Sequence, residues 1–201
     1  MASEDRVYFP CGDMKLEGLF RDADSDRGVV ICHPNPMMGG NMYNNVVESL
    51  LTAFVAKGYS TLRFNFRGTG RSQGIHANGS GEVDDLASAT DFLKNRDIRN
   101  VALAGYSFGA WVTANYLQKQ HVSGPVVLIS PPVSFYEFPG EVIADKVDLI
   151  VCGSRDPFCQ AEDVERFATT INAKVILIPG TDHFYVGREE ILTENVQKNL
   201  L

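Results

Sequence analysis

Residues 101–117 read VALAGYSFGAWVTANYL, and they join a strand-like apolar segment to a helix-like one. At the join, GYSFG over residues 105–109 matches the pattern G-x-S-x-G in the strand-to-helix context that this pattern requires. Glycines at both ends remove side chains that would collide where a strand and a helix approach closely. The stretch therefore predicts a sharp turn, which is either an ordinary glycine-rich turn with a capping serine or a turn that presents Ser107 as a nucleophile.

Short apolar runs alternate with longer amphipathic runs along the whole chain. We expect strands over residues 7–10, 16–20, 28–32, 59–66, 101–106, 126–130, 149–152 and 175–178, and helices over 42–57, 81–94, 108–120, 161–171 and 189–199. Continuous apolar strands that alternate with helices are typical of an α/β protein with a mostly parallel sheet covered on both faces. With no repeat and no linker, residues 1–201 are expected to form one domain, with ligands bound at the carboxyl ends of the strands.

Composition and charge narrow the class of protein. The chain carries a net charge of −7 and is 44% hydrophobic, which is typical of a globular protein. Mild acidity argues against a nucleic acid or an anionic membrane surface as the main partner, since both call for a basic face. The first six residues are polar, and no apolar run is long enough to span a bilayer. We therefore expect a cytoplasmic protein that does not insert into membranes.

The spacing of the four cysteines predicts neither disulfide bonds nor a metal site. Cys11, Cys32, Cys152 and Cys159 form no CxxC pair, so neither a disulfide framework nor a zinc site is expected. Cys32 and Cys152 lie in strand-like apolar runs and are expected to be buried thiols.

Two later loops carry a carboxylate and an imidazole. Asp156 lies just beyond the predicted strand that ends at Cys152, three residues past Gly153. It could hold a histidine in one tautomer there, although Asp-Pro also opens ordinary turns. His183 follows the last predicted strand; imidazole suits proton transfer near neutrality, although a lone loop histidine is more often solvated. Adjacent Asp182 should point elsewhere, as a turn residue. The order Ser107, Asp156, His183 is the chain order of nucleophile-elbow hydrolases, and three coincidental turns in that order are improbable.

An acyl-transfer reaction also needs backbone N–H donors aimed at the developing oxyanion. Phe108, directly after Ser107, should supply one of them, and the loop CHPNPMMGG over residues 32–40 should supply the other. Prolines at 34 and 36 have no N–H, which leaves Asn35 or Met37, and position favours Asn35. His33 lies too early in the chain order to be the base, so we expect it to be structural.

A third glycine-rich loop does not match a nucleotide-binding motif. FRGTGRSQG over residues 66–74 follows a strand, but its glycines are spaced G-x-G-x-x-x-G, one residue longer than the dinucleotide-binding fingerprint. We expect no nucleotide cofactor and no metal. The loop is expected to shape the wall of the site, with Arg67 tying neighbouring loops together.

The motifs HPNPMMGG, NFRGTGRSQG, GYSFGA, GSRDPF and GTDHF together resemble the α/β-hydrolase superfamily, and they span nearly the whole chain. The resemblance is closest to small, cap-less bacterial serine hydrolases. It implies a central, mostly parallel sheet of about seven to eight strands, flanked by helices on both faces and without a lid domain. It also implies serine hydrolase activity on esters, with nucleophile Ser107, acid Asp156, base His183 and oxyanion donors Asn35 and Phe108. The sequence departs from many members of the superfamily at Pro34, where they have glycine.

The segment PPVSFYEFPGEVIADK over residues 131–146 is too short for the helical lid that larger members insert at this point. Apolar side chains from this and neighbouring loops could wall a shallow substrate pocket, although several of them could equally belong to the core. The pocket candidates are Met37, Met38, Phe135, Tyr136, Phe158 and Phe184.

These observations lead to the expectation of a carboxylic-ester hydrolase without a cofactor, whose partner is a small-molecule ester. An open site favours small or short-chain acyl groups. Two alternatives stay open: a thioesterase or acyltransferase with the same triad, because the triad does not encode the leaving group, and a non-catalytic binding protein on a hydrolase fold.

Overall fold

The computed structural model describes residues 3–200, and its centre is one eight-stranded sheet with the order β1-β2-β4-β3-β5-β6-β7-β8. The strands are β1 (Asp5–Cys11), β2 (Met14–Arg21), β3 (Arg27–Cys32), β4 (Ser60–Phe64), β5 (Asn100–Tyr106), β6 (Val126–Ile129), β7 (Leu149–Gly153) and β8 (Lys174–Ile178). β2 runs antiparallel to both β1 and β4, and every other neighbouring pair is parallel. The expected mostly parallel sheet is confirmed.

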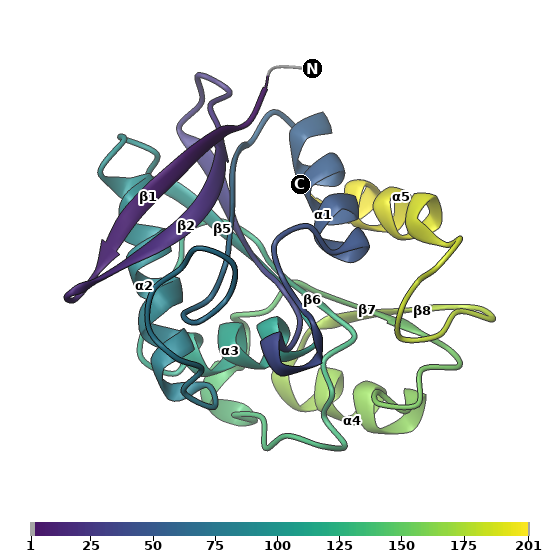
Figure 1. Ribbon diagram of the computed structural model, residues 1–201. Coiled ribbons are helices and arrows are strands. Elements are labelled where there is room, and N and C mark those ends of the chain that lie inside the picture. The colour runs from purple at the N-terminus through teal and green to yellow at the C-terminus, as the bar shows by residue number, and fades with distance from the viewer. Residues whose placement is uncertain (1–2, 201) are drawn as a thin grey trace.

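Five helices cover the two faces of the sheet (Figure 1). They are α1 (Asn45–Ala56), α2 (Ser80–Lys94), α3 (Phe108–Leu117), α4 (Ala161–Ile171) and α5 (Glu189–Asn199). α1 and α5 lie side by side on one face, and α2, α3 and α4 cover the other. Successive strand residues point to opposite faces of the sheet. On β3, Val29 and Ile31 therefore pack in the core under α1 and α5, and Val30 and Cys32 pack in the core under α2, α3 and α4. No helix among residues 3–200 is long and apolar enough to cross a membrane.

Each expected strand and helix is present, but several ends differ. α1 begins at Asn45 rather than residue 42, because the Asn44 side chain accepts a hydrogen bond from the Val46 N–H at 2.9 Å and caps the helix there. β4 ends at Phe64 rather than residue 66, where the chain turns into the glycine-rich loop. Between β6 and β7, the chain forms only one short 3₁₀ turn, η2 (Glu141–Ile143), so this segment carries no helical lid, as expected.

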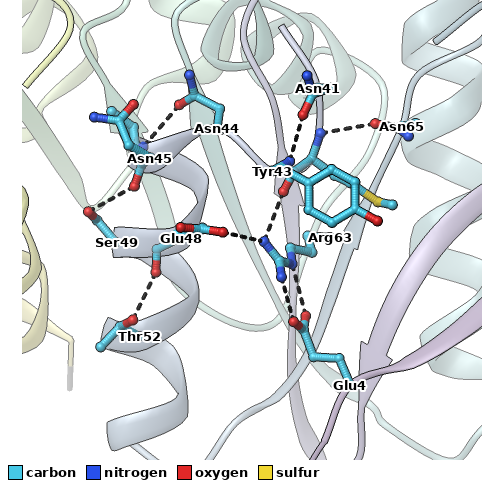
Figure 2. Close-up of polar contacts among 12 residues, drawn as sticks. Glu4, Asn41, Tyr43, Asn44, Asn45, Glu48, Ser49, Thr52, Arg63 and Asn65 are labelled. Atoms are coloured by element: carbon cyan, nitrogen blue, oxygen red, sulfur yellow. Dashed lines mark hydrogen bonds and ion pairs between the residues drawn. The ribbon is translucent and has the colours of Figure 1, made fainter. Parts of the chain in front are cut away.

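A buried arginine fixes the entry into α1 (Figure 2). Arg63 on β4 pairs with Glu4 at 2.6 Å, donates to the Met42 carbonyl at 3.1 Å and lies 3.5 Å from Glu48. The Met42 N–H donates in turn to the side chain of Asn65 at 2.9 Å. Buried ion pairs contribute little net stability, since desolvation offsets their attraction, but they fix geometry through their directional bonds. Both backbone groups of Met42 are therefore held, and the loop between β3 and α1 starts from a defined position.

The central strand β3 supplies a test of this packing. Ile31 is fully buried between β3 and the α1–α5 layer, so Ile31→Ala should lower the free energy of unfolding by about 2–5 kcal/mol in urea denaturation. Ile191, on α5, is 38% exposed and is the matched control: Ile191→Ala should cost less than about 1 kcal/mol. Equal losses in the two variants would contradict the two-layer core.

Candidate active site

Ser107 lies at a strained turn between β5 and α3. Its φ is 54° and its ψ is −116°, a conformation that residues other than glycine rarely adopt. A Cβ on Gly105 would collide with the carbonyl of Gly109, and a Cβ on Gly109 would collide with the carbonyl of Cys32 on β3. Only glycines therefore allow β5, α3 and β3 to meet this closely. The turn raises the Ser107 side chain at the N-terminal end of α3, where the helix dipole is positive.

The structure brings the three predicted polar residues into one hydrogen-bonded chain. His183 Nε2 lies 3.0 Å from Ser107 Oγ, and His183 Nδ1 lies 2.8 Å from Asp156 Oδ2. The residues come from the loops after β5, β7 and β8, whose parallel strands end at the same edge of the sheet. Asp156 and His183 are both buried, and the Phe158 N–H donates to the other Asp156 oxygen at 2.9 Å. A fixed carboxylate of this kind orients the imidazole toward the serine.

The loop that carries His183 is held by two side chains. Asp182 accepts hydrogen bonds from the N–H groups of Phe184 at 2.9 Å and Tyr185 at 3.2 Å, which makes it the turn residue that the sequence predicted. The Tyr106 hydroxyl donates to the His183 carbonyl at 2.8 Å, and its ring packs against the imidazole at a centroid distance of 5.4 Å. Sequence reasoning missed Tyr106, because nothing in the spacing links it to a residue so far along the chain.

Two residues that line the cavity beside Ser107 are the candidates for oxyanion donors: Asn35 in the loop after β3 and Phe108 at the start of α3. Met37 donates its N–H to the Asn35 side chain at 2.8 Å, so this group is already engaged. Within residues 3–200, the backbone N–H groups of Asn35 and Phe108 form no hydrogen bond, and both residues line the same cavity as Ser107. Of the two candidates left open in this loop, the geometry therefore favours Asn35 as the second donor.

His33 is a structural residue, as the sequence predicted. Its Nδ1 lies 2.7 Å from the Pro34 carbonyl, and its Nε2 accepts the Phe66 N–H at 3.1 Å. Complete burial lowers the pKa of His33 from 6.5 to about 4, so the ring is neutral, with its proton on Nδ1. Through these two bonds, His33 ties the loop after β3 to the end of β4.

A cavity of about 460 Å³ opens next to Ser107 and His183. Five of the six predicted pocket residues line it: Met38, Phe135, Tyr136, Phe158 and Phe184. Met37 is not among the lining residues and instead borders a separate depression beside Tyr43 and Arg71. The 3₁₀ turn η1 (Pro36–Met38) directs the two neighbouring methionines to different sides of the loop. No Lys, Arg, Asp or Glu side chain is among the lining residues, so the wall is apolar.

The glycine-rich loop over residues 66–74 does not form part of this wall, which corrects the expectation for it. It packs instead on α2: Arg67 donates from its backbone N–H and its guanidinium to Asp85 at 2.9 and 2.7 Å. Arg67 does anchor its loop, but to buried Asp85 of α2 and not, as expected, to neighbouring loops. The loop is therefore anchored to α2.

Comparison with known proteins agrees with this fold and geometry. Residues 23–143, more than half of the chain, match the family described as serine aminopeptidase, S33. The chain belongs to this family and, with it, to the α/β-hydrolase superfamily.

One relative and two solved structures are similar to this chain over most of the length of both chains. An uncharacterised protein of Rickettsia prowazekii is 30% identical over 98% of this chain and 88% of its own. The solved structure of an α/β serine hydrolase homologue from Coxiella burnetii is 33% identical, with a TM-score of 0.91, and the match covers 100% of this chain and 99% of that one. A serine hydrolase without a lid from Xanthomonas campestris is 25% identical, with a TM-score of 0.86 and coverage of 99% and 94%.

The low pKa of His33 makes stability depend on pH. Because the folded pKa lies below the unfolded value, the unfolded chain binds the extra proton first, and stability is lost as pH falls from about 6.5 through about 4. Between pH 7.5 and pH 5, wild type should lose about 2 kcal/mol more unfolding free energy than His33→Gln in urea titrations. The exposed His121 is the control, since His121→Gln should keep the wild-type slope. A His33→Gln variant with that same slope would show that His33 is not held neutral.

Proposed function

We propose that the protein is a carboxylic-ester hydrolase that works through Ser107, His183 and Asp156 and a covalent acyl-enzyme. The observation that carries this proposal is the hydrogen-bonded chain from Ser107 Oγ to His183 at 3.0 Å and on to Asp156 at 2.8 Å, which opens on an apolar cavity. Membership of the α/β-hydrolase superfamily supports the reaction class.

In the proposed reaction, His183 Nε2 takes the proton of Ser107 Oγ as the oxygen attacks the acyl carbon. The N–H groups of Asn35 and Phe108 donate to the developing oxyanion, each worth on the order of 10²–10³ in rate. His183 then protonates the leaving alcohol, which departs and leaves the acyl group on Ser107. A water molecule, deprotonated by His183, attacks the acyl-enzyme and releases the acid. Asp156 stabilises the imidazolium that forms in both halves of the reaction.

The cavity indicates an uncharged, apolar acyl group of small or short-chain type. Its wall combines aromatic rings with Met38 and contains no Lys, Arg, Asp or Glu side chain. The same wall favours a plain ester over an acyl-CoA thioester, because no Lys or Arg lines it to receive the phosphates of that leaving group. Parallel assays with both substrates distinguish the two. We also propose a cytoplasmic location, since the four cysteines are all free and buried, as is usual in a reducing compartment.

Replacement of the nucleophile tests the mechanism directly. Ser107→Ala should lower kcat for p-nitrophenyl acetate or butyrate by about 10⁴- to 10⁶-fold, because both the nucleophile and its hydrogen bond to His183 are lost. Wild type should also be labelled by a fluorophosphonate, and Ser107→Ala should not. Exposed Ser134, which does not line the cavity, is the control: Ser134→Ala should keep both activity and labelling. Turnover retained in Ser107→Ala would contradict the mechanism. A wild-type protein that the fluorophosphonate does not label would favour the alternative of a non-catalytic binding protein.

Tyr106 is expected to act as a positioning residue. Tyr106→Phe keeps the ring but removes the bond to the His183 carbonyl, a loss of about 0.5–1.5 kcal/mol. We expect kcat for p-nitrophenyl butyrate to fall about 2- to 10-fold with KM nearly unchanged, since the change affects the base rather than the acyl pocket. Tyr43, half-exposed and outside the cavity, provides the matched control, and Tyr43→Phe should match wild type. A raised KM at unchanged kcat would instead place the Tyr106 hydroxyl in substrate binding.

A further inference from the structure

Two cysteines lie beside the carboxylate of Asp156. Cys152 is on β7, and Asp156 and Cys159 are in the loop that follows it. The two sulfurs and a carboxylate oxygen all lie within 4.8 Å of one another, and all three residues are buried. Cys152 Sγ lies 3.7 Å from Asp156 Oδ2 and donates to the Cys159 carbonyl at 3.4 Å. Sequence spacing predicted no metal site here, because the turn of the loop, not a CxxC motif, brings the groups together.

These separations are close to those of a tetrahedral metal site. Zinc binds thiolate sulfur at about 2.3 Å and carboxylate oxygen at about 2.0 Å, so neighbouring ligand atoms are about 3.5–3.8 Å apart. The 3.7 Å between Cys152 Sγ and Asp156 Oδ2 already falls in this range. Two sulfurs and one carboxylate form a donor set that suits soft or borderline divalent cations such as Zn²⁺ and Cd²⁺ rather than Mg²⁺ or Ca²⁺.

We propose that Cys152, Asp156 and Cys159 form an inhibitory binding site for a thiophilic divalent cation, with Zn²⁺ as the type case. The cation would bind Asp156 Oδ2, the same oxygen that accepts the hydrogen bond of His183 Nδ1 at 2.8 Å. It would compete for that oxygen and oppose the positive imidazolium that the reaction must form. Binding itself does not depend on the proposed function, whereas the inhibition rests on it.

The state of the thiols sets the conditions for binding. A metal ion binds sulfur as thiolate, so each thiol gives up its proton to solvent when its sulfur binds the ion. The loop must also open to admit the ion, because Cys152 and Cys159 are fully buried. The site is therefore expected to bind slowly.

Direct binding is measured on the full chain, kept reduced with a phosphine and first stripped with EDTA. Titration with Cd²⁺ should show one ion per chain and the ultraviolet charge-transfer absorption of cadmium thiolate, in wild type and in Ser107→Ala alike. Cys152→Ala and Cys159→Ala should each weaken binding at least tenfold, and either folded variant is sufficient for the test. Cys11→Ala, which removes a buried thiol on β1, should bind as wild type does. Folded wild type without cadmium-thiolate absorption would overturn the proposal.

The activity arm uses Zn²⁺ and p-nitrophenyl butyrate. Zn²⁺ should inhibit wild type reversibly, with recovery on addition of EDTA. Cys159→Ala should keep the basal rate and raise the half-inhibitory Zn²⁺ concentration at least tenfold, whereas Cys11→Ala should not change it. Equal Zn²⁺ sensitivity in wild type and Cys159→Ala would show that the inhibitory ion binds elsewhere and would contradict the proposed site. If no ester is hydrolysed, the proposed function fails, and the cadmium titration alone decides the metal site.

Discussion

The close meeting of β3, β5 and α3 around Ser107 is the constraint on which the rest of the site depends. No side chain fits at Gly105 or Gly109, and Ser107 itself is held at a positive φ. A strained residue of this kind costs about 1–3 kcal/mol and persists only when its surroundings fix it. Here the Ser107 N–H donates to the Ile129 carbonyl of β6 at 2.9 Å, and the buried strands on either side leave the turn no room to relax.

Hydrogen bonds from several elements then converge on His183. Asp156 contacts its imidazole and Tyr106 donates to its backbone carbonyl, so both the side chain and the main chain of His183 are held. Asp156 is shared, since one oxygen accepts the Phe158 N–H while the other faces both His183 and Cys152. The same carboxylate therefore joins the proposed reaction to the proposed metal site, because an ion that binds it changes the environment of the imidazole.

How far the sequence predicted this arrangement depends on the range of each interaction. Ser107 was recognisable because its constraint is local: two glycines, a strand before and a helix after. Asp156 and His183 were recognisable because parallel strands end at one edge of a sheet. The role of Tyr106 was missed because it depends on packing against a segment far along the chain. The proximity of Cys152 and Cys159 was missed because it depends on the path of the loop between them. Met38 lines the cavity and Met37 does not, although both lie in the same 3₁₀ turn. So short a turn has no periodicity from which the direction of each side chain could be predicted.

The short segment between β6 and β7 has a consequence for the fate of the proposed acyl-enzyme. Enzymes that close over their substrates shield reactive intermediates from water, and opening of the lid often limits their turnover rate. This cavity has no helical lid over it, and exposed Phe135 and Phe184 stand at its rim. Solvent can reach the carbonyl on Ser107 as soon as the alcohol departs. Because water is present at its bulk concentration, this openness favours hydrolysis over transfer of the acyl group to another acceptor. The rate of turnover is then set by the chemical steps rather than by the opening of a lid.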